Sequence, residues 1–241
     1  MPKTSELKIK IFADGADFES MMALYAEPYI KGFTTNPTLM RKAGIKEYEE
    51  FGRKILAAIP DRPISLEVFA DDFASMEKQA RVIAGWGSNV NVKIPVTNTK
   101  GEFSGKLIRS LSTDGIVLNI TALLSLRQVK SVAEALDPNT AAIVSVFAGR
   151  VADTGVDPVP LMTEALSILK SRPKAELLWA SPRELLNIFQ ADQIGTHIIT
   201  VTHDLLKKLA NVGYDLEAYS LDTVKMFYND AAASNFSIHI E

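Results

Sequence analysis

The stretch Ser88-Asn89-Val90-Asn91-Val92-Lys93-Ile94-Pro95 decides the fold prediction, because it alternates like a β-strand and carries a lysine. At the two-residue period of a strand, one of its faces is apolar and the other is polar. The apolar row is Val90, Val92 and Ile94, and the polar row is Asn89, Asn91 and Lys93. A strand with one face in water shows the same alternation, so the other stretches must indicate where the polar row points.

Similar stretches recur along the chain, and segments with helical spacing separate them. The other predicted strands span 7–14, 29–35, 63–69, 115–121, 141–147, 175–181 and 197–202. The predicted helices include 18–27, 46–59, a segment between Asp71-Asp72 and Gly85, and a final helix at 216–230. Strands that alternate with helices without a linker predict an α/β fold over 1–241. We expect a single-domain (β/α)8 TIM barrel with a C-terminal helix.

An open, doubly wound sheet is the alternative, since its strands also alternate with helices. Such strands are covered on both faces and should be almost continuously apolar. Polar residues instead recur on one row of the predicted strands, namely Glu67, Asn89, Asn91 and Asn119. A polar row of this kind favours the interior of a barrel.

The composition is that of an ordinary globular protein. Of 241 residues, 47% are hydrophobic and 23% are charged, and the net charge of -3 gives no reason to expect nucleic acid or an anionic membrane as a partner. The absence of cysteine excludes disulfides and a cysteine nucleophile, and no histidine spacing resembles a zinc site. The polar N-terminus lacks a signal-like apolar region, so we expect a cytoplasmic protein without a metal.

Residues suited to chemistry gather where the predicted strands end. In TIM barrels the active site lies at this end of the strands. Several ionisable residues converging there are rarely accidental, because each unpaired buried charge costs several kcal/mol. The candidates are Asp14, Asn36, Glu67, Lys93, Asn119, Thr121, Ser145, Arg150, Ser181 and Arg183.

Lys93 is the predicted nucleophile. A partly dry lumen disfavours the charged form of its amine, which would free it to attack a carbonyl and form a Schiff base. Asp14 could then take the hydroxyl proton that C–C cleavage requires, and Glu67 could handle the water steps. The structural alternatives are a lysine that reaches out of the barrel mouth or pairs with a carboxylate, and acids that cap helices or form salt bridges.

Two arginines follow neighbouring strands and predict an anion site. Arg150 and Arg183 lie close in sequence to Ser145 and Ser181, and guanidinium and hydroxyl groups together suit a phosphate clamp. The alternative is that both arginines are solvated loop charges.

These residues sit in motifs through which the chain resembles the transaldolase family, in particular its short-chain branch with the fructose-6-phosphate aldolases. The resemblance covers nearly the whole sequence. The motifs are Phe12-Ala13-Asp14-Gly15-Ala16, Gly32-Phe33-Thr34-Thr35-Asn36-Pro37-Thr38, Ser65-Leu66-Glu67-Val68, Val92-Lys93-Ile94-Pro95, Leu118-Asn119-Ile120-Thr121, Ser145-Val146-Phe147-Ala148-Gly149-Arg150 and Ala180-Ser181-Pro182-Arg183.

The resemblance implies a role for each matching residue. Lys93 would form the Schiff base, Asp14 would act as general acid and base, and Glu67 with Thr121 would hold the catalytic water. The implied substrate contacts are Asn36, Asn119 and Ser145 around the dihydroxyacetone unit, and Arg150, Ser181 and Arg183 around a phosphate. Thr35 and Phe147 are further implied substrate-binding residues. The family needs no metal or organic cofactor.

The resemblance also bears on the reaction and on assembly. Fructose-6-phosphate aldolases have glutamine where Glu67 stands and tyrosine where Phe147 stands, so this chain looks like a transaldolase. The alternatives are a lyase that releases free dihydroxyacetone, a transaldolase for sulfonated sugars, and an inactive barrel that only binds sugar phosphates. Short-branch members commonly form pentamers paired into decamers. We therefore expect a homo-oligomer, with a dimer as the alternative and 216–241 as a possible contact.

Overall fold

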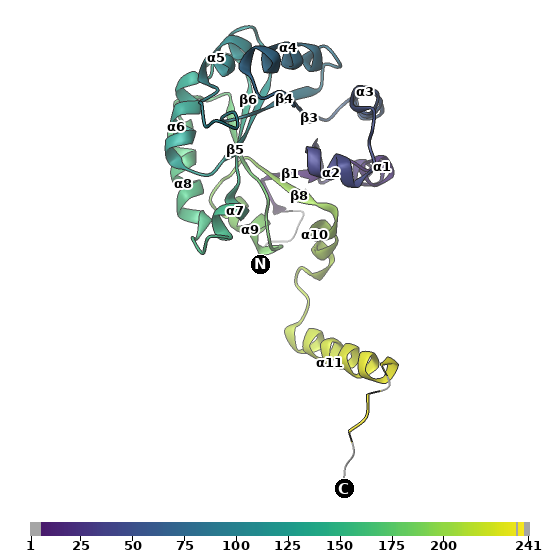
Figure 1. Ribbon diagram of the computed structural model, residues 1–241. Helices are drawn as coiled ribbons and strands as arrows, with labels where there is room; N and C mark the ends of the chain where they lie inside the picture. Colours follow the sequence, from purple (N-terminus) through teal and green to yellow (C-terminus); the bar gives the residue numbers. More distant parts are fainter. Residues whose placement is uncertain (1–5, 235, 239–241) are drawn as a thin grey trace.

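The computed structural model describes residues 6–234 and 236–238, and its strands form a closed parallel barrel (Figure 1). The strands follow one another around the barrel in chain order, and β1 pairs with β8 to close it, which rules out the open sheet. The strands are β1 Lys10–Asp14, β2 Ile30–Thr34, β3 Ile64–Glu67, β4 Val90–Pro95, β5 Leu118–Leu123, β6 Ala142–Val146, β7 Ala175–Trp179 and β8 Ile198–Thr202. The TIM-barrel prediction is confirmed.

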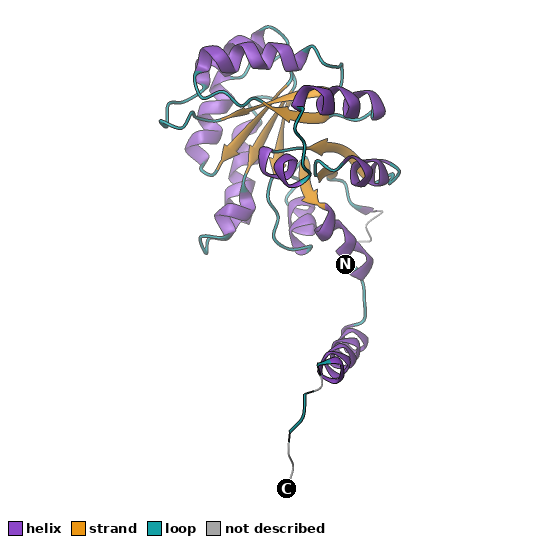
Figure 2. Ribbon diagram, turned by 45° about the vertical axis from the view of Figure 1, so that its right-hand side comes forward, coloured by secondary structure: helices purple, strands orange, loops and turns teal. Residues whose placement is uncertain are grey.

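Helices surround the barrel, and six of the twelve described helices follow a residue whose side chain caps the first turn. Asp72, a predicted cap, accepts a hydrogen bond from the Ser75 amide at 2.8 Å. The helices are α1 Phe18–Tyr25, α2 Pro37–Lys42, α3 Tyr48–Ala58, α4 Phe73–Ala84, α5 Gly105–Thr113, α6 Leu126–Ala135, α7 Ala148–Ala152, α8 Pro158–Leu169, α9 Leu186–Gln193, α10 His203–Lys207, η2 Lys208–Asn211 and α11 Leu216–Ala233. Figure 2 shows the strands enclosed by these helices, with α11 apart.

Some strand ends differ from the prediction, because of contacts with distant side chains or because of the backbone conformation. β1 begins at Lys10 rather than at 7, since the amides of Lys8 and Ile9 donate to the carboxylate of Asp192. β7 ends at Trp179 rather than at 181, and Ser181 has a φ of 57°, which a continuing strand does not allow. Asn89 precedes β4 and donates to carbonyls in the loop before β3.

Two apolar cores leave only one end of the lumen polar. The larger core lies between the barrel wall and the helices and contains the outward residues of the strands, such as Val92 and Ile94. The smaller core fills the lumen with Phe12, Ile143, Leu178, Ala180 and Ile198. Gly32 is required here because a Cβ would lie 2.6 Å from the Phe12 ring. The polar residues of the inward rows therefore collect near the carboxyl ends of the strands.

The C-terminal helix α11 stands clear of the barrel (Figures 1 and 2). None of its residues is buried, although Leu216, Val224, Phe227 and Tyr228 are large and apolar or aromatic. Of the predicted segment 216–241, residues 235 and 239–241 lie outside the described part of the chain. Within that part, every helix is too short or too polar to span a bilayer.

Candidate active site

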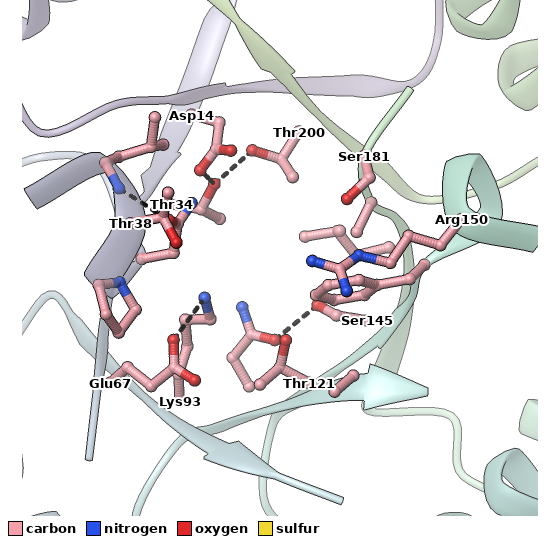
Figure 3. A pocket seen from close by; sticks show the side chains of 18 residues that line it. Asp14, Thr34, Thr38, Glu67, Lys93, Thr121, Ser145, Arg150, Ser181 and Thr200 are labelled. Carbon is pink, nitrogen blue, oxygen red and sulfur yellow. Dashed lines mark hydrogen bonds and ion pairs between the residues drawn. The ribbon is translucent and has the colours of Figure 1, made fainter. Parts of the chain in front are cut away.

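A cavity of about 440 Å³ opens at the carboxyl ends of the strands (Figure 3). This is the end at which TIM barrels carry their active sites. Its walls contain most of the predicted site residues, namely Asp14, Asn36, Glu67, Lys93, Asn119, Thr121, Ser145, Phe147, Arg150 and Ser181. Thr35 and Arg183 are not among the lining residues. Side chains that are far apart in sequence thus share one cavity because their strands end there.

Lys93 lies on β4 and is buried, with 6% of its surface exposed. Its ammonium group donates to the Thr35 carbonyl at 2.8 Å and lies 3.1 Å from a carboxylate oxygen of Glu67. Lys93 therefore does not reach out of the barrel mouth. It pairs instead with a carboxylate, which was one of the structural alternatives for this lysine, and it does so inside the cavity.

Asp14, at the end of β1, lies across the cavity from the ion pair (Figure 3). Thr34 donates its hydroxyl to the Asp14 carboxylate at 2.8 Å, and the hydroxyls of Thr34 and Thr200 are also hydrogen bonded. Burial raises the pKa of Asp14, and this effect outweighs the opposing influence of Lys93 and of the hydrogen bonds from Thr34 and Asn36. A raised pKa makes the carboxylate a stronger base, which suits Asp14 to accept a proton.

A series of hydrogen-bonded side chains connects β3, β5 and β6 beside the cavity. The Asn119 amide donates to the Ser65 hydroxyl at 3.0 Å and accepts from Ser145 at 2.6 Å, so the orientation of its side chain is fixed. The buried hydroxyl of Thr121 has no hydrogen-bond partner among the described residues. A buried hydroxyl without a protein partner is suited to hold a water or a substrate oxygen in the cavity.

The wall opposite the ion pair carries Arg150 and Ser181 (Figure 3). The Arg150 guanidinium lies 5.2 Å from the centre of the Phe147 ring, a distance at which a cation is attracted to the ring face. Ser181 and Ala122, both of which line the cavity, have positive φ values of 57° and 66°. Such backbone conformations in non-glycine residues cluster at functional sites.

The remaining predicted residues have other partners. Arg183 pairs with Asp153, a half-exposed ion pair that lowers the pKa of that aspartate. The Thr35 side chain is buried and donates to the Ser65 carbonyl at 2.9 Å, while its own carbonyl holds Lys93. Asn36 caps α2 by accepting from the Leu39 amide at 2.9 Å. These contacts give Thr35 and Asn36 structural roles beside any contact with substrate.

Comparison with known proteins identifies the family. The model of the "Transaldolase/Fructose-6-phosphate aldolase" family matches residues 11–239. The chain belongs to this family. A "Probable transaldolase" of Dehalococcoides mccartyi is 38% identical over 202 residues, which cover 83% of this chain and 90% of the relative. Others of the same name are 36% identical in Clostridium acetobutylicum, covering 83% and 89%, and 35% identical in Methanococcus maripaludis, covering 84% and 90%.

Solved structures of more distant proteins share the fold of this transaldolase-family chain. Dihydrodipicolinate synthase from Rhodopseudomonas palustris has a TM-score of 0.55 at 15% identity, covering 95% of this chain and 81% of that one. A 3-keto-L-gulonate-6-phosphate decarboxylase from Vibrio cholerae has a TM-score of 0.55 at 12% identity, covering 81% and 88%. At these identities the similarity supports the barrel and carries nothing about the reaction.

Two residues of the cavity beside Asp14, Thr34 and Thr200, were not among the predicted site residues of this transaldolase-family chain. Thr34 donates to Asp14, and Thr200 bonds to Thr34. The two-residue period gives a signal for Thr200, since it shares a row with the lumen residue Ile198. Among the described residues, no group of histidine and acidic side chains is arranged to hold a metal ion.

Proposed function

We propose that this chain is a transaldolase. It would move a dihydroxyacetone unit from a ketose phosphate, such as fructose 6-phosphate or sedoheptulose 7-phosphate, to an aldose phosphate through a Schiff base on Lys93. The observation that carries the proposal is a buried lysine within one cavity with two carboxyl groups, in a family whose relatives are named probable transaldolases.

In the first stage, Lys93 forms the Schiff base. The ammonium group gives a proton to Glu67, the neighbouring carboxylate at 3.1 Å, and the free amine attacks the ketone carbon of the donor. The resulting carbinolamine loses its hydroxyl as water, with Glu67 returning the proton. The product is an iminium ion, and the unpartnered hydroxyl of Thr121 is suited to hold the departing water.

In the second stage, Asp14 drives the exchange of aldehydes. It takes the proton from the hydroxyl on the carbon β to the iminium carbon, and the bond between the α and β carbons breaks. The electron pair of that bond moves into the iminium, which gives an enamine, and an aldehyde leaves. An acceptor aldehyde then adds to the enamine in the reverse sequence, Asp14 returns a proton to the new hydroxyl, and hydrolysis frees Lys93.

The opposite wall would hold the phosphate. Arg150 and Ser181 face the cavity, and an arginine with a hydroxyl suits phosphate recognition. Arg183 would join this clamp only after giving up its ion pair with Asp153. A sulfonated donor would need the same cations and remains the alternative for this end of the substrate.

Glu67 and Phe147 favour the transferase over a lyase, because fructose-6-phosphate aldolases have glutamine and tyrosine at these two positions. In a lyase of the fructose-6-phosphate aldolase type, the enamine would be protonated and free dihydroxyacetone released without an acceptor. The two reactions share every step up to the enamine, so the residues already placed in the cavity serve both. The fate of the enamine is therefore the property to measure.

We also propose that α11 contacts another copy of the chain in a homo-oligomer in the cytoplasm. The helix exposes Leu216, Val224, Phe227 and Tyr228 and buries nothing against its own barrel, so covering these side chains would stabilise an assembly. Multi-angle light scattering measures the number of copies. A single-chain mass at micromolar concentration would refute the assembly.

The reaction itself is tested by trapping. We expect incubation with fructose 6-phosphate and sodium borohydride to leave a reduced dihydroxyacetone adduct on the peptide that contains Lys93, and the Lys93→Ala variant to form none. Absence of the adduct in the unaltered chain would overturn the Schiff-base mechanism. Accumulation of free dihydroxyacetone without an aldehyde acceptor would replace the transferase with the lyase.

A further inference from the structure

The backbone of Glu67 is left without a strand partner on one side. β2 pairs with β3 only at Phe33 with Ile64 and at Thr34 with Ser65, and the chain then turns into α2. On the other side, β4 continues alongside and pairs with Glu67 at Lys93. The amide and carbonyl of Glu67 therefore extend past the end of β2.

The direction of these two groups follows from the neighbouring residues. Successive residues of a strand in a parallel sheet bond alternately to the two sides. The Ser65 carbonyl accepts from the Thr35 amide on the β2 side, while the Val68 amide donates to the Lys93 carbonyl on the β4 side. Glu67, two residues after Ser65, thus presents its N–H and C=O toward the missing strand, where buried backbone groups must find another partner.

A single side chain supplies that partner. The hydroxyl of Tyr48, the first residue of α3, donates to the Glu67 carbonyl at 2.9 Å and accepts from the Glu67 amide at 2.8 Å. One phenol oxygen thereby replaces both ladder bonds of the absent strand. Burial raises the pKa of Tyr48, so its hydroxyl keeps the proton that it donates.

The ring of Tyr48 is held in place by other aromatic side chains. Its centre lies 4.4 Å from that of Phe69 and 5.5 Å from that of Trp86, both in edge-to-face orientation. Trp86 can approach α3 this closely because Gly52 has no side chain, and a Cβ there would lie 2.7 Å from the indole ring. Tyr48 is therefore anchored at its ring as well as at its hydroxyl.

We infer that Tyr48 is a positioning residue that holds the Glu67 carboxylate against Lys93. The inference rests on the proposed function, in which Glu67 exchanges protons with Lys93. The two pair at 3.1 Å, and that distance depends on where the Glu67 Cα is held. β4 fixes the backbone from one side and Tyr48 fixes it from the other. Without the hydroxyl, the end of β3 would be free to move, and the carboxylate would move with it.

The test is the Tyr48→Phe variant, which removes one oxygen and keeps the ring. We expect kcat for transfer to fall on the order of 10-fold or more, with KM for fructose 6-phosphate nearly unchanged, because displacements of about 1 Å at a reacting group are costly. Tyr25→Phe is the matched control. Its hydroxyl donates to Asp61 at 2.7 Å on the surface, and its loss should leave kcat unchanged.

A double-mutant cycle separates positioning from a general structural effect. The readout is the rate of Lys93 adduct formation under borohydride. Tyr48→Phe should slow this rate in the unaltered chain but have no further effect in Glu67→Ala, where no carboxylate remains to be positioned. An equal slowing in both backgrounds would overturn the inference, as would an unchanged kcat in Tyr48→Phe with only a lower melting temperature.

Hydrogen exchange gives a readout that does not need catalysis. The Glu67 amide should exchange faster in Tyr48→Phe than in the unaltered chain or in Tyr25→Phe, since it loses its acceptor. If the unaltered chain forms no adduct, the proposed function fails, and faster exchange would still support the backbone contact. If the adduct forms but exchange and rate are both unchanged, the positioning inference alone fails.

Discussion

Replacing Gly149 by alanine should damage the phosphate end of the cavity while sparing the lysine. Gly149 lies in α7, and its amide donates to the Ala180 carbonyl at 3.2 Å, so α7 packs directly on the chain that ends in Ser181. A Cβ at position 149 would lie 1.5 Å from the Ser181 carbonyl oxygen and 2.5 Å from the Ser181 carbonyl carbon. Both are backbone atoms, so no side-chain rotation relieves the contact.

The size of the effect follows from these distances. Restoring an ordinary contact requires the two segments to separate by about 2 Å. Overpacking of this kind costs about 2–3 kcal/mol of unfolding free energy, which for a chain of this size lowers the melting temperature by about 4–12 °C. A shift of this size at a substrate contact is expected to lower kcat/KM for a phosphorylated donor on the order of 100-fold.

The assay compares two donors. In Gly149→Ala, kcat/KM for fructose 6-phosphate should fall, whereas borohydride trapping of unphosphorylated dihydroxyacetone on Lys93 should continue. Gly85→Ala is the control, because the nearest atom to its added Cβ is a carbonyl oxygen at 3.4 Å. A Gly149→Ala variant with the melting temperature and kcat/KM of the unaltered chain would refute the role given to the Gly149–Ser181 contact. Equal losses with both donors would refute the assignment of this wall to the phosphate.

Three further predictions concern Asp14 and α11. Asp14→Asn should slow C–C cleavage by about 10²–10⁴-fold in single-turnover measurements, while the Lys93 adduct still forms; loss of the adduct would show that Asp14 acts earlier. Burial raises the folded-state pKa of Asp14, so the contribution of Asp14 to stability declines as pH rises from its unfolded-state pKa through its folded-state pKa. Asp14→Asn should therefore melt at a higher temperature than the unaltered chain at pH 7, and this gain should shrink below pH 4. A gain in melting temperature that does not depend on pH would contradict this. Deleting the chain from Asp215 onward should leave a cooperatively unfolding barrel, since α11 buries no residue, and should reduce the mass by light scattering to one chain; an undiminished oligomer would show that α11 is not the contact.

The fold was predictable because its signals are local. Alternation along β4 and helical spacing in α4 are properties of short segments. A chain that repeats these patterns has few ways to bury the apolar faces of both its strands and its helices. Strand ends were less predictable, since they depend on distant side chains. Lys8 and Ile9 leave the ladder because Asp192, from a helix near the other end of the sequence, takes their amides.

Most of the residues that line the cavity could be predicted from the sequence, but the pairing of their side chains could not. Asp14 and Glu67 each end a strand, Lys93 lies two residues before the end of β4, and barrel closure brings the carboxyl ends of all strands together. The sequence does not show, however, which partner a long side chain will contact. Arg183 follows β7 as Arg150 follows β6, yet Arg183 pairs with Asp153 while Arg150 faces the cavity. The support that Tyr48 gives Glu67 likewise depends on where β2 stops, which a single strand does not reveal.

The charges within the cavity assign the proposed proton transfers to different acids. Lys93 and Glu67 form an ion pair, so together they add no net charge. Burial raises the pKa of Asp14, while Lys93 and the hydrogen bonds from Thr34 and Asn36 act to lower it. Glu67 is in contact with the Lys93 ammonium group and is placed to take its proton, whereas Asp14 lies across the cavity. The ionised carboxylate of Asp14 is the form that acts as a base, and Thr34 stabilises this form by donating a hydrogen bond. Glu67 therefore serves the steps that exchange water, and Asp14 serves the steps that break and make the carbon–carbon bond.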